Sequence, residues 1–167
     1  MRLKYFAFGS NLSSLRLQQR IPEAAVHRVA TLSQHQLSWR KNGRDQSGKC
    51  DIEFTGNLED MVYGVVYLMT HDDKLELDIY ETAGFGYDHK HIEVTTVQGE
   101  IVEAFTYFAV DIDHNRQPFH WYKEHVLRGA LEHDFPRHYV EYIKATISIG
   151  DHDQERHFRE LSIYRDD

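Results

Sequence analysis

Short segments rich in β-branched and aromatic residues recur along the chain, each followed by residues that favour turns. The clearest is "VYGVVYLM", residues 62–69, whose composition is typical of a buried strand. A chain with this many short strands is expected to build its core on a β-sheet. Strands are predicted over residues 2–8, 25–40 (one or two strands), 50–54, 61–69, 88–97 and 101–110, the last two forming a hairpin across Gln98 and Gly99.

Helical spacing is less frequent in the first two thirds of the chain. Residues 13–20 are compatible with a short helix. Residues 71–81 predict a longer one, in which Asp72 can act as the cap and Leu75 and Ile79 lie four apart. Glycines then follow and end the helix.

Helices dominate the last third of the chain. An apolar stripe at helical spacing follows Pro118, and Pro136 opens a further helix. Residues 158–164 predict either a short packing helix or a frayed tail. We therefore expect an α+β fold, with a small, mixed, strongly curved β-sheet or barrel and flanking helices.

The length and composition are those of a single globular domain. The chain has 167 residues, 41% of them apolar and only three of them proline, so it can bury a stable core without disulfides or a structural metal. No repeat, low-complexity tract or linker divides it. We predict one domain over residues 1–167, with residues 145–167 as a peripheral C-terminal segment. Oligomeric state cannot be predicted from these features.

The charge balance argues against two classes of partner. The formal net charge is −8 at pH 7, whereas nucleic-acid binding requires a basic face that neutralises phosphates. The same acidity argues against an anionic membrane surface, and no run of 18 apolar residues is present to span a bilayer. Cys50 is the only cysteine, which fits a reducing compartment. We expect a soluble, cytoplasmic protein that binds neither nucleic acid nor membranes.

The first predicted strand ends in an unusual loop, within "YFAFGSNL", residues 5–12. Gly9 removes the side chain where the strand ends, and Ser10 and Asn11 tolerate turn geometry. Their backbone N–H groups can converge on an anion, or on an oxygen that carries developing charge. The alternative is an ordinary strand-to-helix turn, in which Ser or Asn acts as the cap.

Four segments together resemble the γ-glutamylcyclotransferase family. They are "YFAFGSNL", "VYGVVYLM", "LDIYETAGFGYDHKHIEV" and "WYKEHVLRGALEHDFPRHYVEYI", and they occur in the family's order from about residue 5 to residue 143. The resemblance implies a fold of that family. It also implies an enzyme that splits γ-glutamyl amino acids into 5-oxoproline and a free amino acid. Such an enzyme uses no metal or cofactor, and its partner is a small γ-glutamyl substrate.

The resemblance also assigns the site residues. Glu81 matches the catalytic glutamate, which acts as general acid and base. It lies four residues after Leu77, so it is expected to share a helix face with an apolar neighbour and to be partly desolvated. From the residues alone, a solvated helix-end carboxylate is the alternative. Substrate-binding residues implied by the resemblance are Tyr5, Phe6, Ala7, Phe8, Gly9, Ser10, Asn11 and Tyr122, with Tyr87 and Tyr107 as further candidates for the pocket.

The chain departs from the family pattern in ways that bear on substrate preference. Phe8 stands where many relatives have tyrosine, and Thr82 stands where the family often has glycine. Leaving groups would be discriminated by the loops at residues 41–49 and 82–86. Two alternatives stay open: a binding module that recognises a γ-glutamyl-type acid without turnover, and cyclisation of γ-glutamyl amines. Glutathione-specific relatives carry a different loop, which argues against glutathione as the substrate.

Twelve histidines raise the question of a metal site. His89 and His91 alternate along one strand face, and His120 and His125 are five apart, a spacing that points the two rings in different directions. No HExxH motif or Cys–His cluster is present, and zinc needs three or four converging ligands. We therefore expect no metal. Cys50 could act as a nucleophile only beside a histidine base, and its strand-like surroundings favour a packed thiol.

Overall fold

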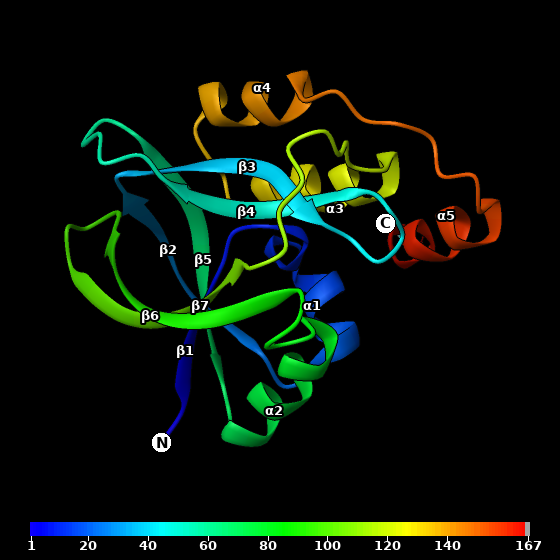
Figure 1. Ribbon diagram of the computed structural model, residues 1–167. Helices are drawn as coiled ribbons and strands as arrows, with labels where there is room; N and C mark the ends of the chain where they lie inside the picture. The colour runs from blue at the N-terminus through cyan, green and yellow to red at the C-terminus, as the bar shows by residue number, and fades with distance from the viewer. Residues whose placement is uncertain (166–167) are drawn as a thin grey trace.

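The computed structural model describes residues 1–165, and its centre is a closed barrel of five strands (Figure 1). The strands follow one another around the barrel in the order β1–β5–β2–β6–β7. Neighbours are antiparallel except at the closure, where Tyr5 of β1 pairs in parallel with Phe105 of β7. The α+β class and the small, curved mixed sheet predicted from the sequence are confirmed. The strands span Leu3–Ala7 (β1), Ala25–Ser33 (β2), Met61–Met69 (β5), Tyr87–Thr96 (β6) and Ile101–Ala109 (β7).

Strand β5 pairs with β1 along one edge and with β2 along the other. Most of its apolar residues are buried, as its near-continuous apolar sequence predicts. Gly64 has no room for a side chain, since a Cβ there would lie 2.4 Å from the Phe6 ring and 2.5 Å from the Ala7 carbonyl oxygen. The glycine thus lets β1 and β5 approach around a large buried aromatic ring.

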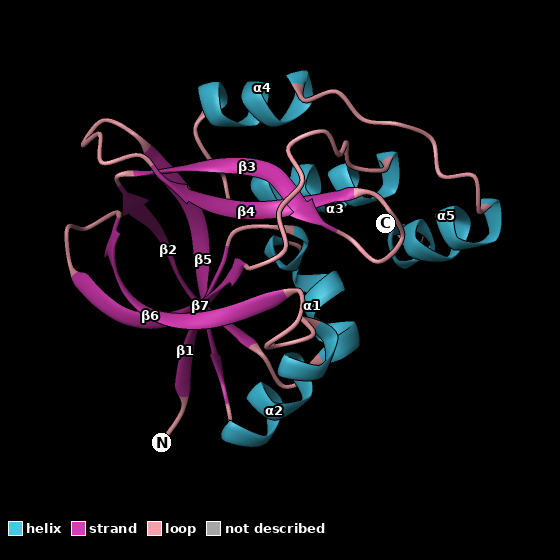
Figure 2. Ribbon diagram, viewed as in Figure 1, coloured by secondary structure: helices cyan, strands magenta, loops and turns pink. Residues whose placement is uncertain are grey.

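A second, two-stranded sheet lies beside the barrel (Figure 2). It is the hairpin of β3 (His35–Asn42) and β4 (Gly48–Phe54), joined by the polar glycine-containing turn that the sequence predicts. The hairpin is tied to the chain that leaves the barrel, because the Asn42 N–H donates to the Asp111 carbonyl at 2.9 Å. This contact fixes the end of β3 beside the segment that follows β7.

The helices pack around the barrel and the hairpin. Thr70 caps α2 in a capping box with Asp73, whereas the sequence suggested Asp72 as the cap. Pro136 precedes α4, as predicted. The helical segments are η1 (Ser10–Leu12), α1 (Ser14–Arg20), α2 (His71–Tyr80), α3 (His120–Glu132), α4 (Arg137–Ala145), α5 (Gln154–Leu161) and η2 (Ser162–Tyr164).

The C-terminal segment forms α5 and η2 rather than a frayed tail, and it lies at the side of the molecule away from β6 (Figure 1). Asp151 anchors it. The buried Asp151 carboxylate accepts hydrogen bonds from Trp121 Nε1 at 2.8 Å and from Arg156 at 2.6 and 2.7 Å. These bonds hold the pKa of Asp151 well below its usual range, with the Arg156 guanidinium as the main cause.

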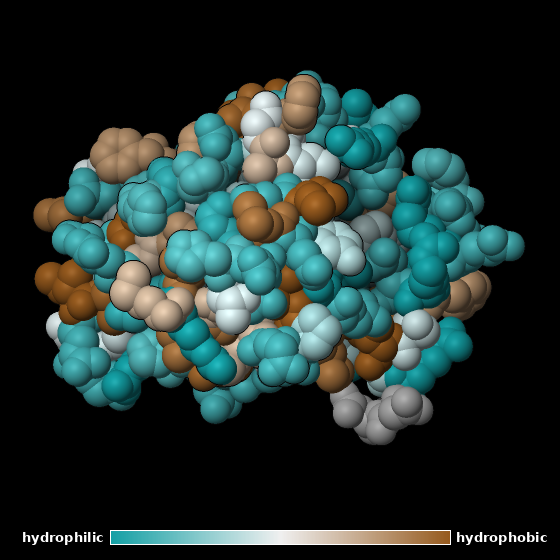
Figure 3. All heavy atoms as spheres, turned by 90° about the horizontal axis from the view of Figure 1, so that it is seen from below, coloured by the Kyte–Doolittle hydropathy of each residue, from teal (hydrophilic) through white to brown (hydrophobic). Residues whose placement is uncertain are grey.

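Figure 3 shows one face on which apolar side chains are scattered among hydrophilic ones. No helix within residues 1–165 is both long enough and apolar enough to cross a bilayer.

Candidate active site

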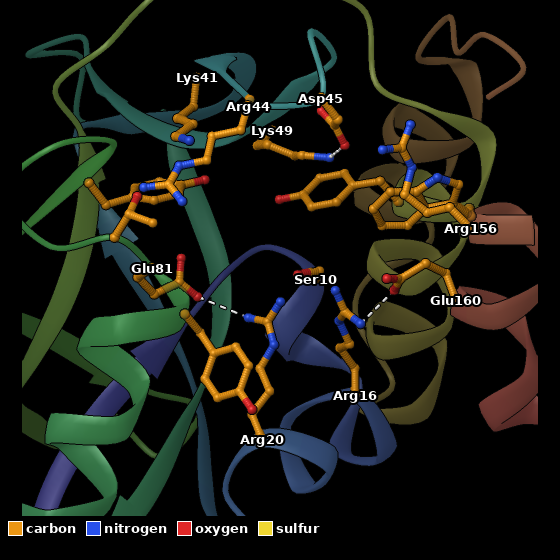
Figure 4. Close-up of a pocket in the computed structure, with 16 residues that line it drawn as sticks. Ser10, Arg16, Arg20, Lys41, Arg44, Asp45, Lys49, Glu81, Arg156 and Glu160 are labelled. Atoms are coloured by element: carbon orange, nitrogen blue, oxygen red, sulfur yellow. Dashed lines mark hydrogen bonds and ion pairs between the residues drawn. The ribbon is translucent and has the colours of Figure 1, made fainter. Parts of the chain in front are cut away.

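Two adjoining cavities lie where the ends of β1 and α2 meet the β3–β4 hairpin and α3. Figure 4 shows the residues that line the outer one. The inner cavity measures about 30 Å³ and the outer cavity about 290 Å³. Both are lined by Ser10, Glu81, Tyr87 and Tyr122, so they form one continuous cleft. Residues of α5 reach the rim of the outer cavity.

The loop after β1 bounds the inner cavity. Gly9 cannot carry a side chain here, because a Cβ would lie 3.0 Å from Cys50 Cβ and 3.2 Å from the Tyr122 hydroxyl. Ser10 and Asn11 open η1 and are buried. The backbone N–H groups of Gly9 and Ser10 make no hydrogen bond to another residue in the described part of the chain. The fold therefore leaves two backbone donors unused at this end of the cleft.

Glu81 stands at the C-terminal end of α2, one turn after the fully buried Leu77, and its side chain is only 13% exposed. Its Oε1 accepts hydrogen bonds from Asn11 Nδ2 at 3.1 Å and from Arg20 Nη1 at 3.2 Å. No residue among residues 1–165 donates to Oε2, and Figure 4 shows the side chain reaching into the cavity. One carboxylate oxygen is fixed while the other is left for a ligand.

Tyr122 and Tyr87 are both held by the main chain of Cys50 in β4. The Cys50 N–H donates to the Tyr122 hydroxyl oxygen at 2.9 Å, and the Tyr87 hydroxyl donates to the Cys50 carbonyl at 2.7 Å. The Tyr122 hydroxyl oxygen accepts this bond from Cys50, so the Tyr122 O–H can still donate a hydrogen bond to a ligand. The Cys50 thiol is buried, as predicted, and burial raises its pKa.

Tyr5 and Tyr107 complete the wall of the inner cavity. The Tyr5 hydroxyl accepts a hydrogen bond from Asn11 Nδ2 at 3.1 Å, and the Tyr107 hydroxyl donates to Asp78 Oδ1 at 2.6 Å. Burial raises the pKa of these two tyrosines and of Tyr87 and Tyr122 above the ordinary value. All four hydroxyls therefore stay protonated near neutral pH and act as hydrogen-bonding groups.

The inner cavity brings together nine of the eleven residues that the sequence assigned to the site, including Phe8. Phe6 and Ala7 do not line either cavity. Both are fully buried within β1, and Phe6 packs against Gly64 of β5. Residues 5–11 thus include side chains that complete the barrel core and others that face the cleft.

Sequence reasoning missed several charged residues of the cleft. Arg20, which contacts Glu81, lies 61 residues away from it in the chain and has no motif around it. Lys41 and Arg44 belong to the loop predicted to discriminate leaving groups, and Arg156 belongs to the segment predicted to be peripheral. The only signal in the sequence was the clustering of polar residues in these loops. Within residues 1–165, no three His, Cys, Asp or Glu side chains gather as a metal site would require.

Among curated proteins, human gamma-glutamylcyclotransferase is 32% identical to this chain over 149 residues, which cover 84% of this chain and 77% of the relative. The chain belongs to the γ-glutamylcyclotransferase family. The bovine gamma-glutamylcyclotransferase is 31% identical over 157 residues, covering 89% of this chain and 79% of the relative. A solved structure titled gamma-glutamyl cyclotransferase superposes with a TM-score of 0.82 at 25% identity, covering 96% of this chain and 99% of that one.

A model of the AIG2-like family also matches, over residues 61–143. This range contains Glu81 and the tyrosines of β6, β7 and α3, whereas the loop after β1 lies outside it. Membership of the γ-glutamylcyclotransferase family supports an enzyme of this kind. It also confirms the family that the four sequence segments resemble.

Proposed function

We propose that the protein converts γ-glutamyl amino acids into 5-oxoproline and a free amino acid, with Glu81 as general acid and base. The observation that carries this proposal is the state of the Glu81 carboxylate. Asn11 and Arg20 hold one oxygen, and the other faces a cleft with no partner in the described chain. A carboxylate held in this way can accept a proton and return it without losing its position.

The proposed reaction joins the α-amine of the glutamyl part to its own γ-carbonyl carbon. The new carbon–nitrogen bond closes a five-membered ring, and the amide bond to the leaving amine breaks. Glu81 takes a proton from the attacking nitrogen and delivers a proton to the leaving nitrogen. Because nucleophile and electrophile belong to one molecule, the enzyme gains most by holding the substrate in a folded shape. No redox or Lewis-acid step is required by this scheme.

The inner cavity supplies groups suited to the glutamyl part. The unused N–H groups of Gly9 and Ser10 can bind its oxygens, and the Tyr122 hydroxyl can donate to an oxygen near the reacting carbon. The inner cavity of about 30 Å³ is smaller than a glutamyl group, so the substrate would extend into the shared part of the cleft. Its leaving group would then occupy the outer cavity.

The test is 5-oxoproline release from a panel of γ-glutamyl amino acids and amines by the wild type and Glu81→Gln. We expect the Gln variant to lose about 10²- to 10⁴-fold in kcat, as is typical when a general acid–base group is removed. Glu76→Gln, on the exposed face of the same helix, is the matched control and should keep full activity. Circular dichroism would establish that both variants are folded.

Two results would count against the proposal. Full activity in Glu81→Gln would show that another group carries the proton. Binding of the panel by the wild type without any 5-oxoproline would favour the binding-module alternative. Turnover of γ-glutamyl amines alone would keep the reaction and change the substrate.

A further inference from the structure

The outer cavity is strongly basic, although the chain as a whole is acidic. The formal net charge is −8, yet six Lys or Arg side chains line this cavity against three Asp or Glu. A concave site that gathers one sign of charge against the sign of the whole protein points to a ligand of the opposite charge. The cationic residues are Arg16, Arg20, Lys41, Arg44, Lys49 and Arg156, and the acidic ones are Asp45, Glu81 and Glu160.

Most of these cations are already engaged by the protein. The three acidic side chains pair one-to-one with Arg16, Arg20 and Lys49, and Arg156 pairs with Asp151. The remaining positive charge is therefore carried by the two residues without an ion pair in the described chain, Lys41 and Arg44. Both lie on the β3–β4 hairpin, at the end of β3 and in the turn.

Lys41 is the more unusual of the two. Only 6% of the residue is exposed, and its ammonium group makes no hydrogen bond or ion pair with any residue from 1 to 165. It lies 5.0 Å from the centroid of the Tyr87 ring. Burial lowers the pKa of Lys41, and the nearby charge of Arg44 acts in the same direction, whereas Glu81 opposes it. The ammonium of this largely buried side chain therefore opens onto the cavity, and no acidic group of the described chain contacts it directly.

Local backbone structure aims this side chain into the cleft. The β3–β4 register shifts between Ser38 and Lys41, so β3 carries one residue more than β4 at this point. Such a bulge redirects the side chains that follow it. Figure 4 shows Lys41 and Arg44 extending from the hairpin toward the side of the cavity that holds Glu81.

We propose that Lys41 and Arg44 form an anion subsite for the leaving group, so that the preferred substrates release an acidic amino acid such as glutamate or aspartate. This inference rests on the proposed function, which places the leaving group in the outer cavity. The released amino acid carries two carboxylates, one for each unpaired cation. A plain amine offers none, and a neutral amino acid offers one.

The sharpest comparison uses substrates that differ only in charge. γ-Glutamyl-glutamate and γ-glutamyl-glutamine have nearly the same shape, but only the first carries a carboxylate at the end of its leaving side chain. For the wild type we expect kcat/KM to be about 10- to 100-fold higher for γ-glutamyl-glutamate, the range of one charged hydrogen bond. The difference should lie in KM, because this contact is remote from the reacting bond.

Lys41→Met and Arg44→Gln test the residues themselves. The variant that removes the partner of the side-chain carboxylate should bring the ratio of the two dipeptides close to one. The other variant should raise KM for both dipeptides alike, and both should leave kcat nearly unchanged. Both should affect a γ-glutamyl alkylamine, which has no leaving carboxylate, by less than about threefold. Arg44 is exposed, so its variant keeps the test valid if Lys41→Met fails to fold. An equal loss on all three substrates would overturn the subsite, as would a wild-type ratio near one.

A binding measurement separates this inference from the proposed reaction. Glu81→Gln can be titrated with the two dipeptides by calorimetry, and selectivity for γ-glutamyl-glutamate would support the subsite without any turnover. If the wild type released no 5-oxoproline while this binding preference persisted, the reaction would be wrong and the anion subsite would stand. Equal affinity for both dipeptides would overturn the subsite even if the wild type were fully active.

Discussion

At the scale of single residues, Thr82 occupies a conformation that β-branched residues rarely adopt. Its φ is +51°, in the left-handed region. The position closes α2 in a Schellman motif, in which the Ala83 N–H donates to the Asp78 carbonyl at 2.9 Å and the Thr82 N–H to the Ile79 carbonyl at 3.2 Å. This backbone requirement explains why a glycine suits the position directly after Glu81.

Thr82→Gly should therefore stabilise the protein by about 1 kcal/mol, because relief of the left-handed strain outweighs the added freedom of the unfolded chain. Urea unfolding followed by circular dichroism measures the change. Thr82→Ala is the control, since it removes the branch but keeps the Cβ that causes the strain. A Gly variant no more stable than the Ala variant would show that φ is not the source of the strain.

At the scale of elements, the loop after β1 takes its position from α3. Gly129 of α3 lies directly on η1, where a Cβ would be 2.3 Å from Leu12 Cβ and 2.5 Å from the Ser13 nitrogen. These atoms belong to the same turn as Ser10 and Asn11. The distance between α3 and η1 therefore sets the position of the donors that the inner cavity presents.

Gly129→Ala should destabilise the protein by about 1–3 kcal/mol, the usual cost of overpacking, although alanine is the better helix former. It should also lower kcat/KM, because η1 would shift relative to Glu81. Unfolding curves and 5-oxoproline assays measure the two effects. Leu131→Ala, at an exposed position two residues further along α3, should change neither. A Gly129→Ala variant as stable and active as the wild type would contradict the close-packing argument.

Much of the element structure could be predicted from the sequence, because strands and turns leave local signals. The face of a helix that packs against the core is harder to predict. Leu75 and Ile79 have helical spacing, yet both are exposed, since α2 contacts the barrel through the buried Leu77 on another face. Spacing alone shows which residues share a face but not which face packs.

The site was predictable where its residues are contiguous and unpredictable where tertiary structure brings them together. The loop around Ser10 and the position of Glu81 are visible in short motifs. Arg20 and Lys41 reach the cleft only because α1 and the hairpin end beside it, and no local pattern encodes that proximity. The role of Cys50 could not be predicted either, since it orients Tyr122 and Tyr87 through its main-chain N–H and carbonyl and not through its thiol.

At the scale of the whole molecule, a buried histidine links the C-terminal segment to the rest. His125 of α3 is fully buried, with Nδ1 2.6 Å from the Tyr164 hydroxyl and Nε2 3.3 Å from Glu160. Glu160 in turn pairs with Arg16 of α1 at 2.5 Å. Burial lowers the pKa of His125 to about 4, Arg16 and Arg20 act in the same direction, and Glu160 opposes them.

This shift makes global stability depend on pH in a defined window. An unfolded histidine titrates near pH 6.5, so between about pH 6.5 and pH 4 the unfolded chain binds a proton at this residue and the folded protein does not.

The contribution of His125 to the free energy of unfolding is therefore complete above about pH 6.5 and is lost as the pH falls. The free energy of unfolding should decrease by about 2 kcal/mol from pH 7 to pH 5. Burial, the largest single effect, raises the pKa of Glu160, but hydrogen bonding to His125 and the charge of Arg16 outweigh it and lower that pKa. His125→Gln keeps a hydrogen-bond donor and cannot titrate, so its unfolding free energy should change about 2 kcal/mol less over the same range. Parallel pH profiles for the two proteins would mean that His125 is protonated equally in the folded and unfolded states.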